Sequence, residues 1–256
     1  MKIRFVVVAL VAVSALPWSS TRAFAQQNVT IEFTGVANPS VQTLGAYAGY
    51  YTGTVNGVAS TPGFICDDYN HEIFLPQESW QATASSFSSL ATSSTALNST
   101  LFGNTIGIAG YAAIAYLSNL MASTPASGQA DIAAAIWYIG TIGSSNPLSF
   151  SSLDATAQDY VDEWLGDSTT KGLYDGTYGL TSASAFTSAA TAELAGSSLW
   201  LYTPIANTQT AGDPFPQEFV GSVAVPEGGA ALVYLLLATL VCGGAFFLRN
   251  REQVRG

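Results

Sequence analysis

Basic residues are nearly absent from the middle of this 256-residue chain. Of its seven Lys and Arg residues, three precede Gln26 and three follow Ala224, which leaves Lys171 alone between them. The same stretch contains 15 acidic residues, so its formal net charge is −14. Because such a surface repels phosphate groups, we expect no nucleic acid partner.

Cysteine and histidine are also scarce. Cys242 lies in an apolar run near the C-terminus, so Cys66 is the only cysteine outside that run, and His71 is the only histidine. A lone cysteine forms no intramolecular disulfide, and one Cys with one His is short of the three or four ligands of a zinc site. The chain also lacks a Gly-rich phosphate loop and a nucleophile elbow. We therefore predict a protein without a cofactor that is not an enzyme.

The C-terminal segment 223–256 has a three-part layout. A short motif, 225–229, is followed by an uncharged apolar run of 19 residues, Ala230–Leu248. A helix of that length can cross a bilayer core of about 30 Å. The basic tail 249–256 would then stay on the cytoplasmic side.

This layout resembles the sorting signal of the PEP-CTERM family, in which Val-Pro-Glu-Pro precedes an apolar helix and an arginine cluster. Val225, Pro226 and Glu227 match that motif, whereas Gly228 stands where the family has its second proline. The resemblance implies export, transient anchoring in the inner membrane through Ala230–Leu248, and cleavage near the motif by an exosortase-type peptidase. The mature protein would then be at the cell surface or extracellular. The alternative is a permanent single-span anchor.

The N-terminal residues 1–25 have the pattern of a secretory signal peptide. Lys2 and Arg4 precede an apolar segment, 5–16, that is too short to span a membrane comfortably. Ala23 and Ala25 then form a small-x-small site for signal peptidase. Removal of both ends leaves 26–222 as one extracytoplasmic domain.

Within this domain, alternating and aromatic-rich segments predict strands, and apolar residues at helical spacing predict helices. The predicted strands are 29–33, 47–55, 63–69, 80–84, 198–203 and 217–220, with Asn56-Gly57 as a tight turn. The predicted helices are 106–121, 129–139, 151–165 and 185–194. The order of strands, helices and strands indicates an α+β fold, a small antiparallel β-sandwich or barrel with an inserted helical subdomain.

The densest polar cluster is the segment 66–72. A strand through it would place Cys66 and His71 on opposite faces, which disfavours a catalytic pair. Asp67, Asp68 and Glu72 offer the oxygen ligands that calcium prefers, but their spacing is not that of an EF-hand. A structural role at the end of a strand is the other interpretation.

Two short segments resemble bacterial surface thioester domains. Phe64-Ile65-Cys66-Asp67-Asp68 is similar to the cysteine strand of that family, and Ala133-Ala134-Ala135-Ile136-Trp137 is similar to its Thr-Gln-x-Ala-Ile-Trp helix. In that family the Cys and Gln side chains form an internal thioester. Here Ala133 stands at the Gln position, and Gln129 lies a helical turn earlier. We therefore expect Cys66 to be a buried packing residue that faces the inserted helices.

These features together predict an exported cell-surface or matrix protein with a structural or adhesive role. The link to extracellular polysaccharide and biofilm is implied by the PEP-CTERM resemblance. A glycan- or calcium-binding module is the alternative, and a covalent thioester adhesin is a further one. Aromatic side chains that could stack on sugars are Tyr47, Tyr50, Tyr51, Trp80, Trp137, Tyr138, Trp164 and Trp200.

Overall fold

The computed structural model of this chain describes residues 26–73, 75, 78–165, 183–210 and 216–222. The predicted signal peptide with Ala23 and Ala25, the predicted sorting motif Val225, Pro226 and Glu227, and the apolar run 230–248 lie outside these ranges. None of the helices in the described part of the chain has the length and hydropathy needed to cross a membrane.

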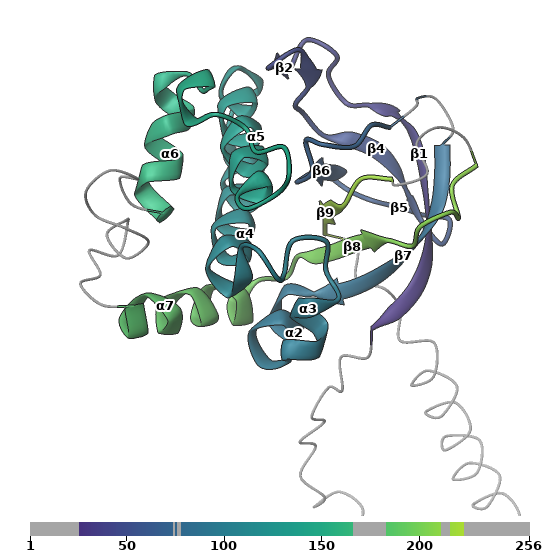
Figure 1. The fold of residues 1–256 in the computed structure, drawn as a ribbon. Coiled ribbons are helices and arrows are strands. Elements are labelled where there is room, and N and C mark those ends of the chain that lie inside the picture. The colour runs from purple at the N-terminus through teal and green to yellow at the C-terminus, as the bar shows by residue number, and fades with distance from the viewer. Residues whose placement is uncertain (1–25, 74, 76–77, 166–182, 211–215, 223–256) are drawn as a thin grey trace, which may run out of the picture.

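The described residues form an α+β fold in which an antiparallel β-barrel packs beside a group of helices (Figure 1). The strands are β1 (Gln27–Val36), β2 (Gln42–Thr43), β3 (Ala46–Tyr47), β4 (Tyr51–Val55), β5 (Val58–Ala59), β6 (Phe64–Cys66), β7 (Glu78–Ser86), β8 (Trp200–Pro204) and β9 (Phe219–Gly221). The larger sheet has the order β1-β7-β8-β9-β6-β4-β5.

A second pairing of β1 closes this sheet. β1 pairs with β7 through Gln27–Phe33 and with β4 through Ile31–Val36, so six strands form a ring and β5 extends from β4. The register along β1 and β4 shifts between Phe33 and Gly35, as at a β-bulge, which lets a strand bend. The structure therefore selects the barrel from the two predicted alternatives.

Local turn chemistry determines the hairpins. Asn56 and Gly57 have φ angles of 50° and 79°, which are the positive values that a two-residue turn between β4 and β5 requires. Leu44 and Gly45, with φ of 52° and 80°, turn the chain between β2 and β3. This separate hairpin is why the predicted strand 47–55 is divided into β3 and β4.

All the described helices lie between β7 and β8 in the sequence, as the predicted insertion requires. They are α2 (Phe87–Thr92), α3 (Ser94–Asn98), α4 (Gly107–Ser123), α5 (Ala126–Thr141), the short 3₁₀-helix η1 (Phe150–Ser152), α6 (Ala155–Leu165) and α7 (Ala183–Gly196). Asp154 caps α6, because its Oδ1 accepts a hydrogen bond from the Ala157 amide at 2.8 Å.

Two apolar cores meet at the strands β6 and β9. Phe64, Cys66 and Phe219 belong to the core inside the barrel, whereas Ile65 and Val220 belong to the core between the barrel and the helices. This alternation follows from the two-residue period of a strand. These strands are therefore covered on both faces, and residues that continue them are close to the helices.

Candidate functional site

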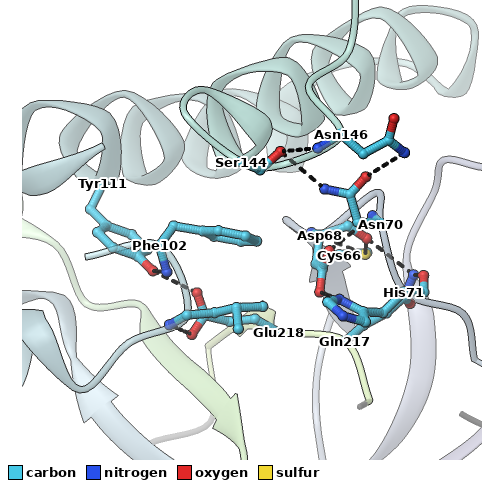
Figure 2. Close-up of polar contacts among 11 residues, drawn as sticks. Cys66, Asp68, Asn70, His71, Phe102, Tyr111, Ser144, Asn146, Gln217 and Glu218 are labelled. Carbon is cyan, nitrogen blue, oxygen red and sulfur yellow. Dashed lines mark hydrogen bonds and ion pairs between the residues drawn. The ribbon is translucent and has the colours of Figure 1, made fainter. Parts of the chain in front are cut away.

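The strand β6 ends at Cys66, and the following residues form a compact turn held by side chains. The Cys66 thiol donates a hydrogen bond to the Asp68 carbonyl oxygen at 2.9 Å. The Asp68 Oδ1 accepts from the Asn70 amide at 2.9 Å, and its Oδ2 lies 2.5 Å from Nδ1 of His71 (Figure 2). These side-chain contacts hold residues 67–71 after strand pairing ends at Cys66.

This turn corrects the predicted strand 63–69. Because the strand stops at Cys66, the alternation of strand faces does not decide where His71 lies. Cys66, Asp68 and His71 are drawn into one cluster, with Asp68 between the other two (Figure 2). His71 interacts with the Asp68 carboxylate, whereas Cys66 interacts with the Asp68 backbone.

Cys66 is 3% exposed and its side chain packs with the barrel interior. The helix α5 contacts its backbone instead: Nε1 of Trp137 donates to the Cys66 carbonyl oxygen at 3.0 Å. Ala133 on the same helix is buried. Burial raises the pKa of the Cys66 thiol well above its usual value, and the charges of Asp68 and Asp67 raise it further. The thiol therefore stays protonated, which is the unreactive form.

A glutamine from the far end of the domain completes this cluster. Nε2 of Gln217 donates to the Asp68 carbonyl oxygen at 3.1 Å and also to the His71 carbonyl oxygen. Both acceptors are carbonyl groups, so the orientation of the amide is fixed. The residue is only 7% exposed, and its Oε1 is buried without a hydrogen-bond partner. An unpaired buried acceptor of this kind calls for an explanation.

A cavity of about 460 Å³ opens beside the cluster. Its polar lining residues are Asp68, His71, Glu72 and Gln217, and its aromatic ones are Tyr47, Tyr51, Tyr69 and Trp137. Drug-sized and sugar-sized ligands occupy cavities in this range of volume. The cavity is therefore the candidate binding site.

The aromatic rings form two pairs. Tyr47 and Tyr51 meet edge to face with their centroids 5.0 Å apart, and Tyr69 and Trp137 lie 5.3 Å apart. The three tyrosine hydroxyls donate to backbone carbonyl oxygens, namely those of Tyr50, Tyr47 and Leu44. A ligand would therefore meet ring surfaces and not tyrosine hydroxyls.

A second cavity of about 410 Å³ lies on another side of His71. Nδ2 of Asn70 donates to Oγ of Ser144 at 3.4 Å, and Nδ2 of Asn146 donates to Oδ1 of Asn70 at 3.4 Å (Figure 2). This amide and hydroxyl network joins the turn after β6 to the loop after α5. His71 lines both cavities.

Two buried acids lie behind the cavity, between the barrel and the helices. The Glu218 carboxylate accepts a hydrogen bond from Tyr111 Oη at 2.6 Å (Figure 2). It also accepts from the Leu101 amide at 2.9 Å and from Thr203 Oγ1 at 2.5 Å. The carboxyl group of Asp67 is fully buried beside that of Glu218, and no hydrogen-bond donor of the described residues reaches its oxygens. Burial raises the pKa of Asp67 well above its usual value, and the charges of Glu218 and Asp68 add to that shift.

The calcium candidates are not assembled into a site. Asp67 is buried beside Glu218, Asp68 binds His71 and Asn70, and Glu72 is at the exposed edge of the cavity. Within the ranges that the structure describes, no three Asp, Glu, His or Cys side chains are grouped so that they could hold a metal ion.

Three residues of the site were not expected from the sequence. The sequence pattern places Gln217 and Glu218 at the start of a predicted strand and Tyr69 at the end of another. In the structure all three lie just outside the strands β9 and β6. No local signal marks them, since their roles depend on β9 lying next to β6.

Comparison of the chain with protein-family models, with curated proteins and with solved structures finds no match.

Proposed function

We propose that this chain is an exported surface or matrix protein with an adhesive role, and that its domain binds a saccharide of the extracellular polysaccharide in the aromatic cavity. The observation that carries the proposal is the combination, in one cavity, of the half-buried rings of Tyr47 and Tyr69, backed by the buried Trp137, with the polar groups of Glu72 and Gln217. Aromatic rings cover the apolar faces of sugars, and a few convergent polar groups fix their orientation.

The charge of the domain supports an uncharged or positively charged ligand. Between residues 26 and 222 the sequence has Lys171 as its only Lys or Arg, and none occurs among the described residues. A phosphate or a polyanionic chain would meet no countercharge there. The ligand is therefore sought among neutral and amine-bearing polysaccharides.

The proposal includes no catalytic step. The raised pKa of Cys66 disfavours the thiolate that a nucleophilic cysteine needs. His71 Nδ1 is engaged by Asp68, which could orient an imidazole, but the hydrogen bonds of Cys66 are made to Asp68 and not to His71. Binding is the simpler role for these groups.

Saccharide binding is tested with the full-length chain purified in detergent, by calorimetric titration with fragments of polysaccharide from its native host. Tyr69→Leu removes one aromatic wall and should weaken binding about tenfold, since an aromatic contact contributes about 1.4 kcal/mol. Tyr138→Leu is the matched control, because Tyr138 is a half-buried tyrosine of α5 that packs on Phe150 and does not line the cavity. Equal binding by both variants would contradict the assignment of the site.

The sorting part of the proposal is tested separately in the native host. Deletion of the exosortase-type peptidase, or replacement of Pro226 and Glu227 by alanine, should trap a full-length form in the membrane. The mass of the mature surface protein gives the answer for the wild type. If the mature protein still contains residues 230–250, the segment is a permanent anchor and not a sorting signal.

A further inference from the structure

We infer that the saccharide bound in the aromatic cavity carries a protonated amine, so that the ligand class is an amino sugar with free amino groups. This inference rests on the proposed function and narrows it. It comes from the kind of hydrogen-bonding groups that the cavity still offers once the contacts within the protein are counted.

The first observation is the unpaired acceptor of Gln217. Its Nε2 is bound to two backbone carbonyl groups, and its Oε1 is a buried acceptor without a partner in the lining of the cavity. A buried acceptor left unpaired costs about 1–3 kcal/mol. Because Oε1 is not exposed, a donor on a ligand would recover this free energy only when the side chains that cover Oε1 move aside on binding, and a ligand that only accepts would not recover it at all.

The second observation is the balance of charge around the cavity. Glu72 and Asp68 line it, and the only basic side chain of the lining is His71, whose Nδ1 lies 2.5 Å from the Asp68 carboxylate. Glu72 is exposed, so its carboxylate can reach a ligand. The polar groups therefore favour a cation that donates hydrogen bonds.

The third observation is the presentation of the rings. The hydroxyls of Tyr47, Tyr51 and Tyr69 are bound to backbone carbonyl groups. The half-buried Tyr47 and Tyr69 therefore present ring surface to the cavity, with the buried Tyr51 packed against Tyr47. Aromatic faces attract ammonium groups, with about 0.5–1 kcal/mol per contact at exposed sites and more when water is excluded. The same rings can cover the apolar face of the sugar, so one cavity would hold both parts of an amino sugar.

The test compares four probes on the full-length chain in detergent, at a pH where the amines are protonated. The probes are glucosamine oligomers, N-acetylglucosamine oligomers, glucose oligomers of the same length and linkage, and the polyamine spermidine. We expect the glucosamine oligomers to bind at least about tenfold more tightly than the acetylated and neutral oligomers and than spermidine, because only they combine the charge with the ring.

Glu72→Gln separates recognition in the cavity from general attraction to an acidic protein. It should weaken glucosamine binding about fivefold, which is about 1 kcal/mol, and leave binding of the neutral oligomers unchanged. Glu32→Gln is the control, because Glu32 is an exposed acid on β1 outside the cavity lining. Equal losses in both variants, or no loss in Glu72→Gln, would overturn the inference.

The outcomes also distinguish this inference from the proposed function. If the neutral or acetylated oligomers bind as tightly as the glucosamine oligomers or more tightly, the requirement for an amine is overturned and saccharide binding stands. Spermidine binding as tightly as the glucosamine oligomers would overturn the amino sugar as the ligand class. Failure of every saccharide probe, together with failure of the host polysaccharide, would overturn both.

Discussion

Asp67 is the buried group whose ionisation should most affect the stability of this domain. Glu218, Asp68 and Cys66 lie beside it, and no hydrogen-bond donor of the described residues reaches its carboxyl oxygens. Its pKa is raised first by burial and then by the neighbouring carboxylates. Glu218 accepts three hydrogen bonds, so it is the member of the pair that can carry the charge. Asp67 is therefore the member that holds a proton.

This assignment predicts that stability falls as the pH rises. A carboxyl group with a raised folded-state pKa contributes stability that is fully present below its unfolded-state pKa of about 3.9 and is lost as the pH rises through the folded-state value. Asp67→Asn, which is never charged, should flatten this decline. Urea unfolding at several values between about pH 5 and about pH 9 measures it. An unchanged pH profile in the variant would contradict the assignment.

Glu218→Gln is the contrasting substitution at the same site. In this variant the NH₂ group of the new glutamine takes the place of one carboxylate oxygen. It would then face a donor from Tyr111, Thr203 or the Leu101 amide, with which it cannot pair as an acceptor. We expect a loss of about 1–3 kcal/mol in the free energy of unfolding. Thermal melting at neutral pH compares the two variants, and equal stability of Asp67→Asn and Glu218→Gln would argue against the roles given to the pair.

Cys66 is predicted to be a structural thiol without a thioester. The mass of the purified protein should equal that of its processed sequence, and Cys66 should react with a thiol reagent only after denaturation, because it is buried and protonated. Cys66→Ser should cost about 1–3 kcal/mol, since it replaces a thiol in the barrel core by a more strongly hydrated hydroxyl whose shorter bond brings it less close to the Asp68 carbonyl oxygen.

The contrary outcome has a specific signature. A mass short by one ammonia, with methylamine adding to the native protein, would indicate a thioester. The structure gives Gln217 as the glutamine to test, since its Nε2 and the Cys66 thiol both donate to the Asp68 carbonyl oxygen. Gln129, whose side chain donates to the Thr124 carbonyl oxygen, is the second glutamine to test.

At the scale of elements, the close approach of α5 to the end of β6 determines the shape of the site. A Cβ atom on Gly140 would lie 2.4 Å from the backbone oxygen of Asp67. The helix can therefore pack this closely only because residue 140 has no side chain. Trp137, one turn earlier, holds the same contact through its hydrogen bond to Cys66.

Gly140→Ala should therefore destabilise the domain, although alanine favours a helix by about 1 kcal/mol over glycine. The clash with backbone should outweigh this gain and cost about 1–3 kcal/mol net. The control is Gly196→Ala in α7, where an added Cβ meets nothing within 4 Å. Calorimetric melting of both variants checks this, and a stabilised Gly140→Ala would show that α5 is not held against β6 as described.

At the scale of the whole molecule, the last strand closes the barrel. β9 pairs with β6 on one side and with β8 on the other. The ring centroids of Phe219 and Phe33 lie 4.5 Å apart in the barrel core. We predict that residues 26–222 fold alone and melt cooperatively, whereas residues 26–215 do not. Circular dichroism of the two fragments decides this. A cooperative transition in the shorter fragment, or none in the longer, would contradict it.

Much of the fold follows from local sequence patterns. The alternation in 29–33 predicted β1, and the Asn56-Gly57 pair predicted the turn after β4. The Ala-rich apolar segment 106–121 predicted α4, and helical spacing predicted α5 and α6 within a few residues. These patterns succeed because the period of buried residues and the φ angles of a turn are properties of neighbouring residues.

The site depends on contacts that no local pattern contains. Gln217 binds the carbonyl group of Asp68 across a separation of 149 residues, and Glu218 binds Tyr111 across 107. A two-residue period shows that one face of a strand is buried, but not which strand lies beside it, so the closure of the barrel and the cavity at its end were decided by the tertiary structure. The sequence by itself determined the acidic charge, the class of fold and the expectation of export. Strand order and helix packing decided which side chains share a cavity, because only long-range pairing brings the turn after β6, α5 and the residues before β9 together.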